Sequence, residues 1–114
     1  MVIAAILIAA DAAEIDGVPI ALLPWRGDDT LIEYHMAQLQ AAGVDVIEVV
    51  LGHEAERIIP LVARDNVEPI VDGRWQADAA SAVRVGATAA PRDTDAAIIV
   101  RADDEVSIST FGLL

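Results

Sequence analysis

Carboxylates follow directly after two of the most apolar segments of the chain. Residues 103–105, Asp-Asp-Glu, come just after the run Ala96–Val100, and Asp11 comes just after the run Val2–Ala10. Carboxylate oxygens are the ligands that hard cations such as Mg²⁺ prefer. The three carboxylates at 103–105 are therefore candidate metal ligands, and the alternative is a solvated acidic turn.

Four other residues have side chains that can take part in chemistry. His53 can act as a base, but it stands at the start of an expected helix, where a turn or capping role is favoured. His35 lies within another expected helix and is assigned to the surface or to core packing. Trp75 can stack on a base or pack against the third expected helix, and packing is favoured. Ser81 has no histidine or lysine nearby in the sequence to activate it, so a nucleophile is not expected there.

Apolar runs predict the strands that must position these side chains. The four runs are Val2–Ala10, Val46–Leu51, Val67–Val71 and Ala96–Val100. The first and the last show almost no alternation of apolar and polar residues, which is typical of strands that are covered on both faces.

Between the strands, apolar residues recur at the spacing of a helix. The three expected helices cover Leu31–Ala42, the segment after Gly52-His53, and Asp78–Ala90. Thr30 followed by Glu33 is a capping-box signature for the first helix. Pro60 should shorten or kink the second helix, and Asp78 is the expected N-cap of the third.

The alternation of strands and helices predicts an α/β fold, with three layers and a mainly parallel, Rossmann-like sheet. Pro69 belongs at a sheet edge, so we expect the strand order 3-2-1-4. Residues 106–110, V-S-I-S-T, alternate like a short strand and are expected to cover the fourth strand, in the same molecule or in a homodimer. Arg101 is expected to pair with Asp11 across neighbouring strand ends.

Composition narrows the function classes. The chain has 114 residues, a formal net charge of −12, seven basic residues that are all arginine, and no cysteine. We therefore expect one domain, no partner among nucleic acids or membranes, and no thiolate chemistry. The nine apolar residues of Val2–Ala10 are about half a membrane span, and no basic residue precedes them, so a cytoplasmic protein is expected.

Several segments together carry a resemblance to a known family. They are I-A-A at 8–10, G-V-P-I-A-L-L-P at 17–24, A-A-G-V at 41–44, V-V-L-G-H-E-A-E at 49–56, the set Trp75, Ser81, Val83, Arg84 and Gly86, and Ala102-Asp103. In this order they resemble the MobA-like nucleotidyltransferases, which have a GT-A type Rossmann-like fold. The resemblance implies transfer of a nucleoside monophosphate from an NTP to a phosphorylated acceptor. It also implies a single, truncated nucleotidyltransferase-like domain over residues 1–114.

The resemblance also implies site residues. Ala9, Ala10, Gly17, Pro19 and Ser81 would contact the nucleotide. Asp103 would bind Mg²⁺ if the protein is active, and otherwise no cofactor is expected. The ligand would be a nucleotide or another small phosphorylated molecule.

The signature loop departs from the family pattern, which is roughly A-G-x-x-x-R-M-G-x-x-K. Asp11, Ile15 and Ile20 stand where the pattern has glycine, arginine and lysine. The loop at 11–16 carries three acidic residues and no cation, although a triphosphate needs cationic partners. We therefore expect a degenerate protein, impaired or inactive in NTP binding, that acts as a binding or interaction module. The alternatives are an active Mg²⁺-dependent nucleotidyltransferase and a dimeric structural subunit.

Overall fold

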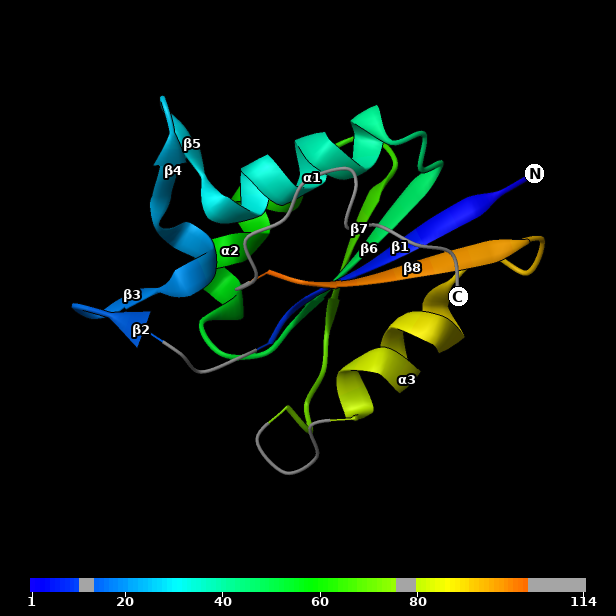
Figure 1. The fold of residues 1–114 in the computed structure, drawn as a ribbon. Coiled ribbons are helices and arrows are strands. Elements are labelled where there is room, and N and C mark those ends of the chain that lie inside the picture. The colour runs from blue at the N-terminus through cyan, green and yellow to red at the C-terminus, as the bar shows by residue number, and fades with distance from the viewer. Residues whose placement is uncertain (11–13, 76–79, 103–114) are drawn as a thin grey trace.

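A four-stranded parallel sheet forms the centre of the protein (Figure 1). The computed structural model describes residues 1–10, 14–75 and 80–102. The strands are β1 (Ile3–Ala9), β6 (Val46–Leu51), β7 (Val67–Val71) and β8 (Ala96–Arg101), in the order β7-β6-β1-β8. This order confirms the expected arrangement of the four apolar segments, with β1 inside the sheet. Pro69 lies in β7, at an edge as predicted.

Helices cover both faces of the sheet and complete three layers (Figure 1). The helices α1 (Leu31–Ala41) and α2 (Ala55–Val62) lie on one face, and α3 (Ser81–Ala89) lies on the other. The predicted α/β, Rossmann-like fold class is therefore confirmed. No helix among the described residues is long and apolar enough to cross a membrane.

The start of α1 follows the capping-box prediction. The hydroxyl of Thr30 accepts a hydrogen bond from the backbone N–H of Glu33 at 3.4 Å. The carboxylate of Glu33 accepts in return from the backbone N–H of Thr30 at 3.0 Å. Two N–H groups that the helix cannot pair internally are satisfied in this way.

The other two helices can be compared with their predicted forms in turn. Pro60 lies inside α2, which ends two residues later, at Val62, in line with the expected shortening. The helix α3 begins at Ser81 with Ala80 in the capping position. Asp78, the expected N-cap, lies outside the described residues, and the described cap stands two residues further along the chain.

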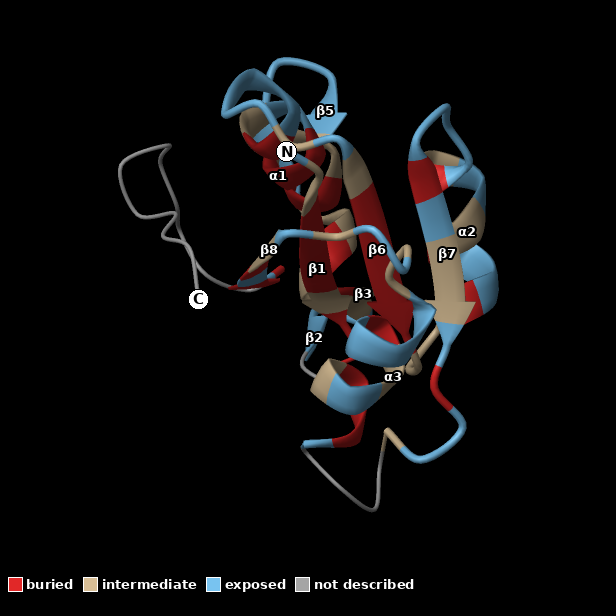
Figure 2. Ribbon diagram, turned by 90° about the vertical axis from the view of Figure 1, so that its right-hand side faces the viewer, coloured by how far each residue is buried: buried red, intermediate tan, exposed pale blue. Residues whose placement is uncertain are grey.

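The core is divided by the sheet. The larger cluster joins the sheet to α1 and α2 through residues such as Leu7, Ile32, Leu39 and Val49. On the other face, Ile6, Val50 and Ala82 are buried under α3. Figure 2 shows β1 and β6 buried along most of their length and β7 more exposed.

Close approach of α3 to the sheet depends on a glycine. A Cβ atom added at Gly86 would lie 2.5 Å from Cγ2 of Ile6 and 3.3 Å from Cγ2 of Val50. Such distances are well inside van der Waals contact, so α3 can pack at this depth only because residue 86 has no side chain.

Two short ribbons between β1 and α1 were not predicted. The first pairs β2 (Glu14–Ile15) with β3 (Val18–Pro19), and the second pairs β4 (Pro24–Arg26) with β5 (Asp29–Thr30). A 3₁₀ turn, η1 (Ile20–Leu22), joins them. Figure 1 shows both ribbons projecting from the same side of the sheet as α1 and α2.

Candidate functional site

Residues 14–19, in the described part of the segment that corresponds to the signature loop, form a tight hairpin. Ile15 pairs with Val18, and the two residues between them, Asp16 and Gly17, have φ angles of 52° and 77°. Positive φ at both central positions is the mark of a type I′ turn, which suits the twist of a two-residue hairpin. Gly17 therefore serves the turn in this structure.

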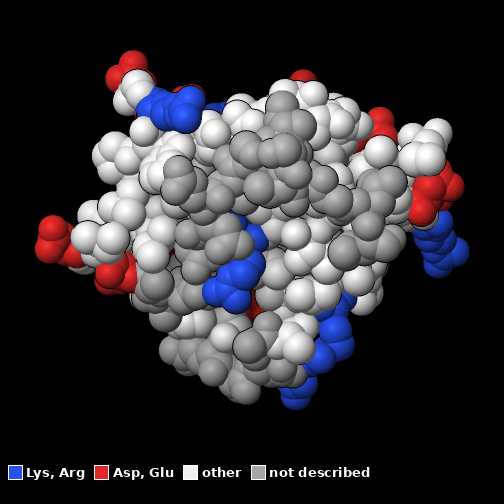
Figure 3. Space-filling view, in the orientation of Figure 1, with Lys and Arg blue, Asp and Glu red and all other residues white. Residues whose placement is uncertain are grey.

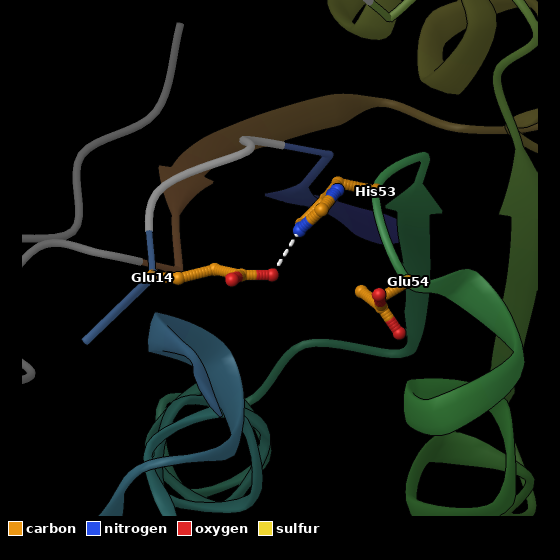
Figure 4. Close-up of side chains that lie close together, drawn as sticks. All are labelled: Glu14, His53 and Glu54. Carbon is orange, nitrogen blue, oxygen red and sulfur yellow. Dashed lines mark hydrogen bonds and ion pairs between the residues drawn. The ribbon is translucent and has the colours of Figure 1, made fainter. Parts of the chain in front are cut away.

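An ion pair ties this hairpin to the turn between β6 and α2. Nε2 of His53 contacts Oε2 of Glu14 across 39 residues of sequence (Figure 4). Both side chains are partly exposed. The backbone N–H of His53 also donates to the carbonyl of Ala10 at 3.5 Å, so the turn lies beside the end of β1. The turn role expected for His53 is confirmed, and its pairing with Glu14 was not anticipated.

Glu54 brings a second carboxylate to this pair. One donor atom each from Glu14, His53 and Glu54 lie within 4.8 Å of one another. Glu54 has φ 56° and ψ 35°, the left-handed region that non-glycine residues rarely adopt, at the N-cap of α2. Figure 4 shows its side chain beside the Glu14–His53 pair.

Arg57 places a cation near the hairpin. Its Nη1 donates to the carbonyl oxygen of Gly17 at 3.4 Å and lies 3.7 Å from Oε2 of Glu54. The guanidinium therefore links the first turn of α2 to the tip of the hairpin.

Trp75 packs beside the same turn. Its ring centroid lies 5.4 Å from that of His53, with the two planes inclined by 53°. A Cβ atom added at Gly52 would lie 2.4 Å from Cγ of Trp75. The indole thus packs against Gly52 and His53, whereas its expected partner was the third helix.

The residues that the resemblance assigned to the nucleotide occupy different environments. Ala9 and Ala10 are buried at the end of β1, and Pro19 is buried in β3. Gly17 is exposed at the hairpin tip. Ser81 is buried, and its hydroxyl donates to Oδ2 of Asp72.

Asp72 organises the start of the segment that leads to α3. Its side chain is 3% exposed, and its Oδ1 accepts from the backbone N–H of Arg74 at 2.9 Å. Its own N–H donates to the carbonyl of Leu51 at 2.7 Å. Because Ser81 binds this carboxylate, its hydroxyl has a structural partner.

His35 is a core residue that fastens the end of β8. The imidazole is fully buried, and its Nε2–H donates to the carbonyl of Ala102 at 2.9 Å. Ala102 directly precedes Asp103, the expected metal ligand. Asp103, Asp11 and the segment 106–110 lie outside the described residues, so their expected roles stay predictions.

Charged side chains are dispersed on the face drawn in Figure 3. Figure 3 shows arginine side chains in separate places on one face and acidic groups mostly near its rim.

The strand order β7-β6-β1-β8, with helices on both faces of the sheet, fits a nucleotidyltransferase-like class of protein. The model of the MobA-like NTP transferase domain matches the chain over residues 4–104. The chain therefore belongs to the MobA-like NTP transferase family, as its motifs indicated.

Solved structures share the fold. The chain is similar to Rv0371c from Mycobacterium tuberculosis H37Rv, with a TM-score of 0.79 and 24% identity over 95% of this chain and 55% of that one. A manganese complex of Rv0371C from the same organism has a TM-score of 0.78 and 23% identity, over 96% of this chain and 55% of that one. A nucleotidyl transferase from Methanothermobacter thermautotroptrophicus (Mth528) has a TM-score of 0.79 and 26% identity, over 96% of this chain and 54% of that one. This chain spans about half the length of these proteins. No curated protein matches it at a significant level.

Proposed function

We propose that this chain is a degenerate MobA-like domain that binds NTPs weakly or not at all and acts as a binding or interaction module. The observation that carries the proposal is the tight β2–β3 hairpin, which holds two carboxylates and no cationic side chain of its own. Glu14 of this hairpin is engaged by His53, and Gly17 occupies the turn.

Electrostatics supports the same proposal. Each close like-charge contact between a carboxylate and a phosphate costs on the order of 1–4 kcal/mol at about 4 Å. The loss of two charge-assisted partners, at the positions of Ile15 and Ile20, removes roughly 1.5–3 kcal/mol each. Micromolar affinity corresponds to about 8 kcal/mol, so these changes are large enough to abolish it.

A thermal-shift panel of the four NTPs, each with Mg²⁺ or Mn²⁺, tests the proposal, with each metal alone as the reference. A ligand at a hundredfold excess over its Kd stabilises the folded state by about 2.7 kcal/mol. We expect no such shift for the wild-type chain. A clear shift, or transfer of a nucleoside monophosphate to any acceptor, would refute the proposal.

A repaired loop provides the positive control. The triple variant Asp11→Gly, Ile15→Arg and Ile20→Lys restores the residue types of the family pattern, and we expect it to gain an NTP-dependent shift. The matched control makes the same change of three charge units at exposed positions outside the hairpin, as Asp65→Asn, Val71→Arg and Gln40→Lys. We expect this control to stay silent.

An active Mg²⁺-dependent nucleotidyltransferase, acting on a phosphorylated cofactor-type acceptor, is the second candidate. The hydrogen bond of Arg57 to the hairpin favours it, because a guanidinium at this place can partly replace the missing cations of the loop. Divalent metals are typical of this family. Under this candidate, Asp103→Asn abolishes turnover and leaves the fold intact, whereas Asp93→Asn, at an exposed position before β8, leaves turnover unchanged. Unchanged turnover in Asp103→Asn would reject the assignment.

A second copy of the chain is the partner that we propose to test first for an interaction module. Among the described strands, β8 is the outer strand opposite β7, and Ile99 on it is 36% exposed. Sheet edges are common sites of strand pairing between chains. Sedimentation equilibrium should show a mass that rises with concentration, and Ile99→Lys should lower it. A constant monomer mass would exclude this partner.

A further inference from the structure

We propose that Glu14, His53 and Glu54 form a binding site for one divalent transition-metal ion, with Zn²⁺ preferred to Mg²⁺. This site differs from the Asp103 position that the family resemblance implies. The proposal does not depend on whether the chain binds nucleotides.

The spacing of the donor atoms fits a single ion. Their mutual separations are all within 4.8 Å. Zinc binds nitrogen and oxygen ligands at about 2.0–2.2 Å, so two donors on one ion lie at most about 4.2 Å apart. Glu14 and His53 are in direct contact, so a bound ion takes the place of this hydrogen bond and separates the two donors, while the Glu54 carboxylate turns toward them.

Two segments of the chain bring the donors together, since His53 and Glu54 are consecutive residues between β6 and α2. Glu14 belongs to β2, His53 to the turn after β6, and Glu54 to the N-cap of α2. Contact with Trp75 restricts the imidazole of His53, and the left-handed backbone of Glu54 fixes where its side chain starts. Ligands that are already restrained in this way lose little conformational freedom when they bind an ion.

Arg57 is the competitor for Glu54, and it is a weak one. The separation of 3.7 Å is long for an ion pair, and the two side chains are 43% and 30% exposed. Pairs of this kind contribute little in water. An arriving ion can therefore take the Glu54 carboxylate while Arg57 keeps its hydrogen bond to Gly17.

The ligand types decide which ion is preferred. Imidazole nitrogen suits zinc and other late first-row ions, whereas Mg²⁺ prefers oxygen ligands alone and keeps several waters. One imidazole with two carboxylates therefore favours Zn²⁺. Two carboxylates balance the charge of a divalent ion, and three protein ligands leave at least one coordination position for water or an anionic oxygen.

Calorimetric titration of the metal-free chain with ZnCl₂, and separately with MgCl₂, tests the site without any nucleotide. We expect one equivalent of Zn²⁺ to bind and Mg²⁺ to bind at least about tenfold more weakly. The variants His53→Gln, Glu14→Gln and Glu54→Gln should each lower the Zn²⁺ affinity by about tenfold or more. Glu56→Gln is the matched control, because Glu56 is exposed in the first turn of α2 and lies outside the cluster.

The visible absorption of bound Co²⁺ supplies a second measurement, and it would not depend on His53 if this residue had only a structural role. Co²⁺ bound at this site should give visible d–d absorption that disappears in His53→Gln and persists in Glu56→Gln. Circular dichroism of each variant confirms that the fold is intact. The proposal is overturned if no saturable Zn²⁺ binding occurs, or if the folded His53→Gln variant binds Zn²⁺ like the wild type, which would assign the ion to other acidic residues.

Discussion

The two faces of the sheet differ in the size of the buried apolar cluster that each one carries. On the face covered by α1 and α2, seventeen buried residues form one apolar cluster, whereas three buried residues form the described cluster under α3. The α3 face also holds Glu48, which is 1% exposed in the middle of β6. The first face therefore supplies most of the stability, and the second face tolerates features that a well-packed core excludes.

Glu48 shows what the second face tolerates. Burial raises the pKa of its carboxyl group, and the nearby charge of Glu68 on β7 raises it further. Its Oε2 has no hydrogen-bond partner among the described residues. A buried acid of this kind binds a proton more readily in the folded state than in the unfolded chain.

The largest expected effect comes from truncating the first face. Leu39→Ala removes a fully buried side chain from the large cluster, and we expect the free energy of unfolding to fall by about 2–5 kcal/mol. Val85→Ala removes a partly buried side chain from the small cluster and should cost about 1–2 kcal/mol. Denaturant unfolding measures both. Equal losses would contradict the difference between the faces.

Gly86→Ala tests how closely α3 packs. The added methyl group would overlap Ile6, and overpacking of this kind costs about 1–3 kcal/mol. The better helix propensity of alanine returns up to about 1 kcal/mol, so we expect a net loss of stability. Gly73→Ala is the control, because no atom lies within 4 Å of its added Cβ. An unchanged unfolding midpoint for Gly86→Ala would mean that α3 is free to move outward.

Glu48→Gln tests the buried acid through pH. Because the folded-state pKa lies above the ordinary value of 4.5, wild-type stability should fall as the pH rises from 4.5 through the folded-state pKa. The variant should lose this part of the pH dependence and gain about 1 kcal/mol at pH 8. Urea unfolding across this pH range measures the slope.

Glu68→Gln is the matched control for Glu48. It removes only the smaller, charge-related cause of the raised pKa, so its pH profile should stay close to that of the wild type. If Glu48→Gln and the wild type gave parallel profiles, the carboxyl group of Glu48 would be in contact with water.

The smallest expected effect is at the start of α1. Thr30→Ala removes the hydroxyl of the capping box, and we expect a loss of about 1 kcal/mol. Thr88→Ala, at an exposed position of α3, should change stability by less than about 0.5 kcal/mol. Thermal unfolding of both variants gives the comparison, and equal midpoints would show that the cap adds nothing.

The capping box also has a pH signature. Hydrogen bonds from the backbone N–H and hydroxyl of Thr30, together with Arg64, hold the pKa of Glu33 below 4.5 despite partial burial. Its contribution to stability is therefore present above pH 4.5 and is lost as the pH falls through the folded-state pKa.

The sequence predicts the central sheet and its helices well because these elements depend on local patterns. Apolar runs, the proline of β7 and the Thr30–Glu33 signature each report on a few neighbouring residues, and together they give the sheet order and the helices. The β2–β3 hairpin was missed although it carried a signal. Asp16-Gly17 between Ile15 and Val18 is a typical type I′ hairpin sequence.

The candidate site depends on contacts that no local pattern contains. Glu14 and His53 are 39 residues apart, and His35 and Ala102 are 67 apart. Each pair forms only when the whole sheet is assembled. Glu48 lies within an apolar run, and the sequence alone does not say whether its side chain lies under α3 or in solvent.

The central place of β1 has a consequence for the order in which the protein can assemble during synthesis. Ile3 lies opposite Ala96 in the sheet, so the ribosome must add 93 residues before these partners can meet. At about 5–20 residues per second, this takes roughly 5–19 s. During this time the most apolar segment of the nascent chain can pair only with β6 on one side. The other edge of β1 therefore stays unpaired until β8 emerges, and unpaired strand edges are sites at which nascent chains aggregate.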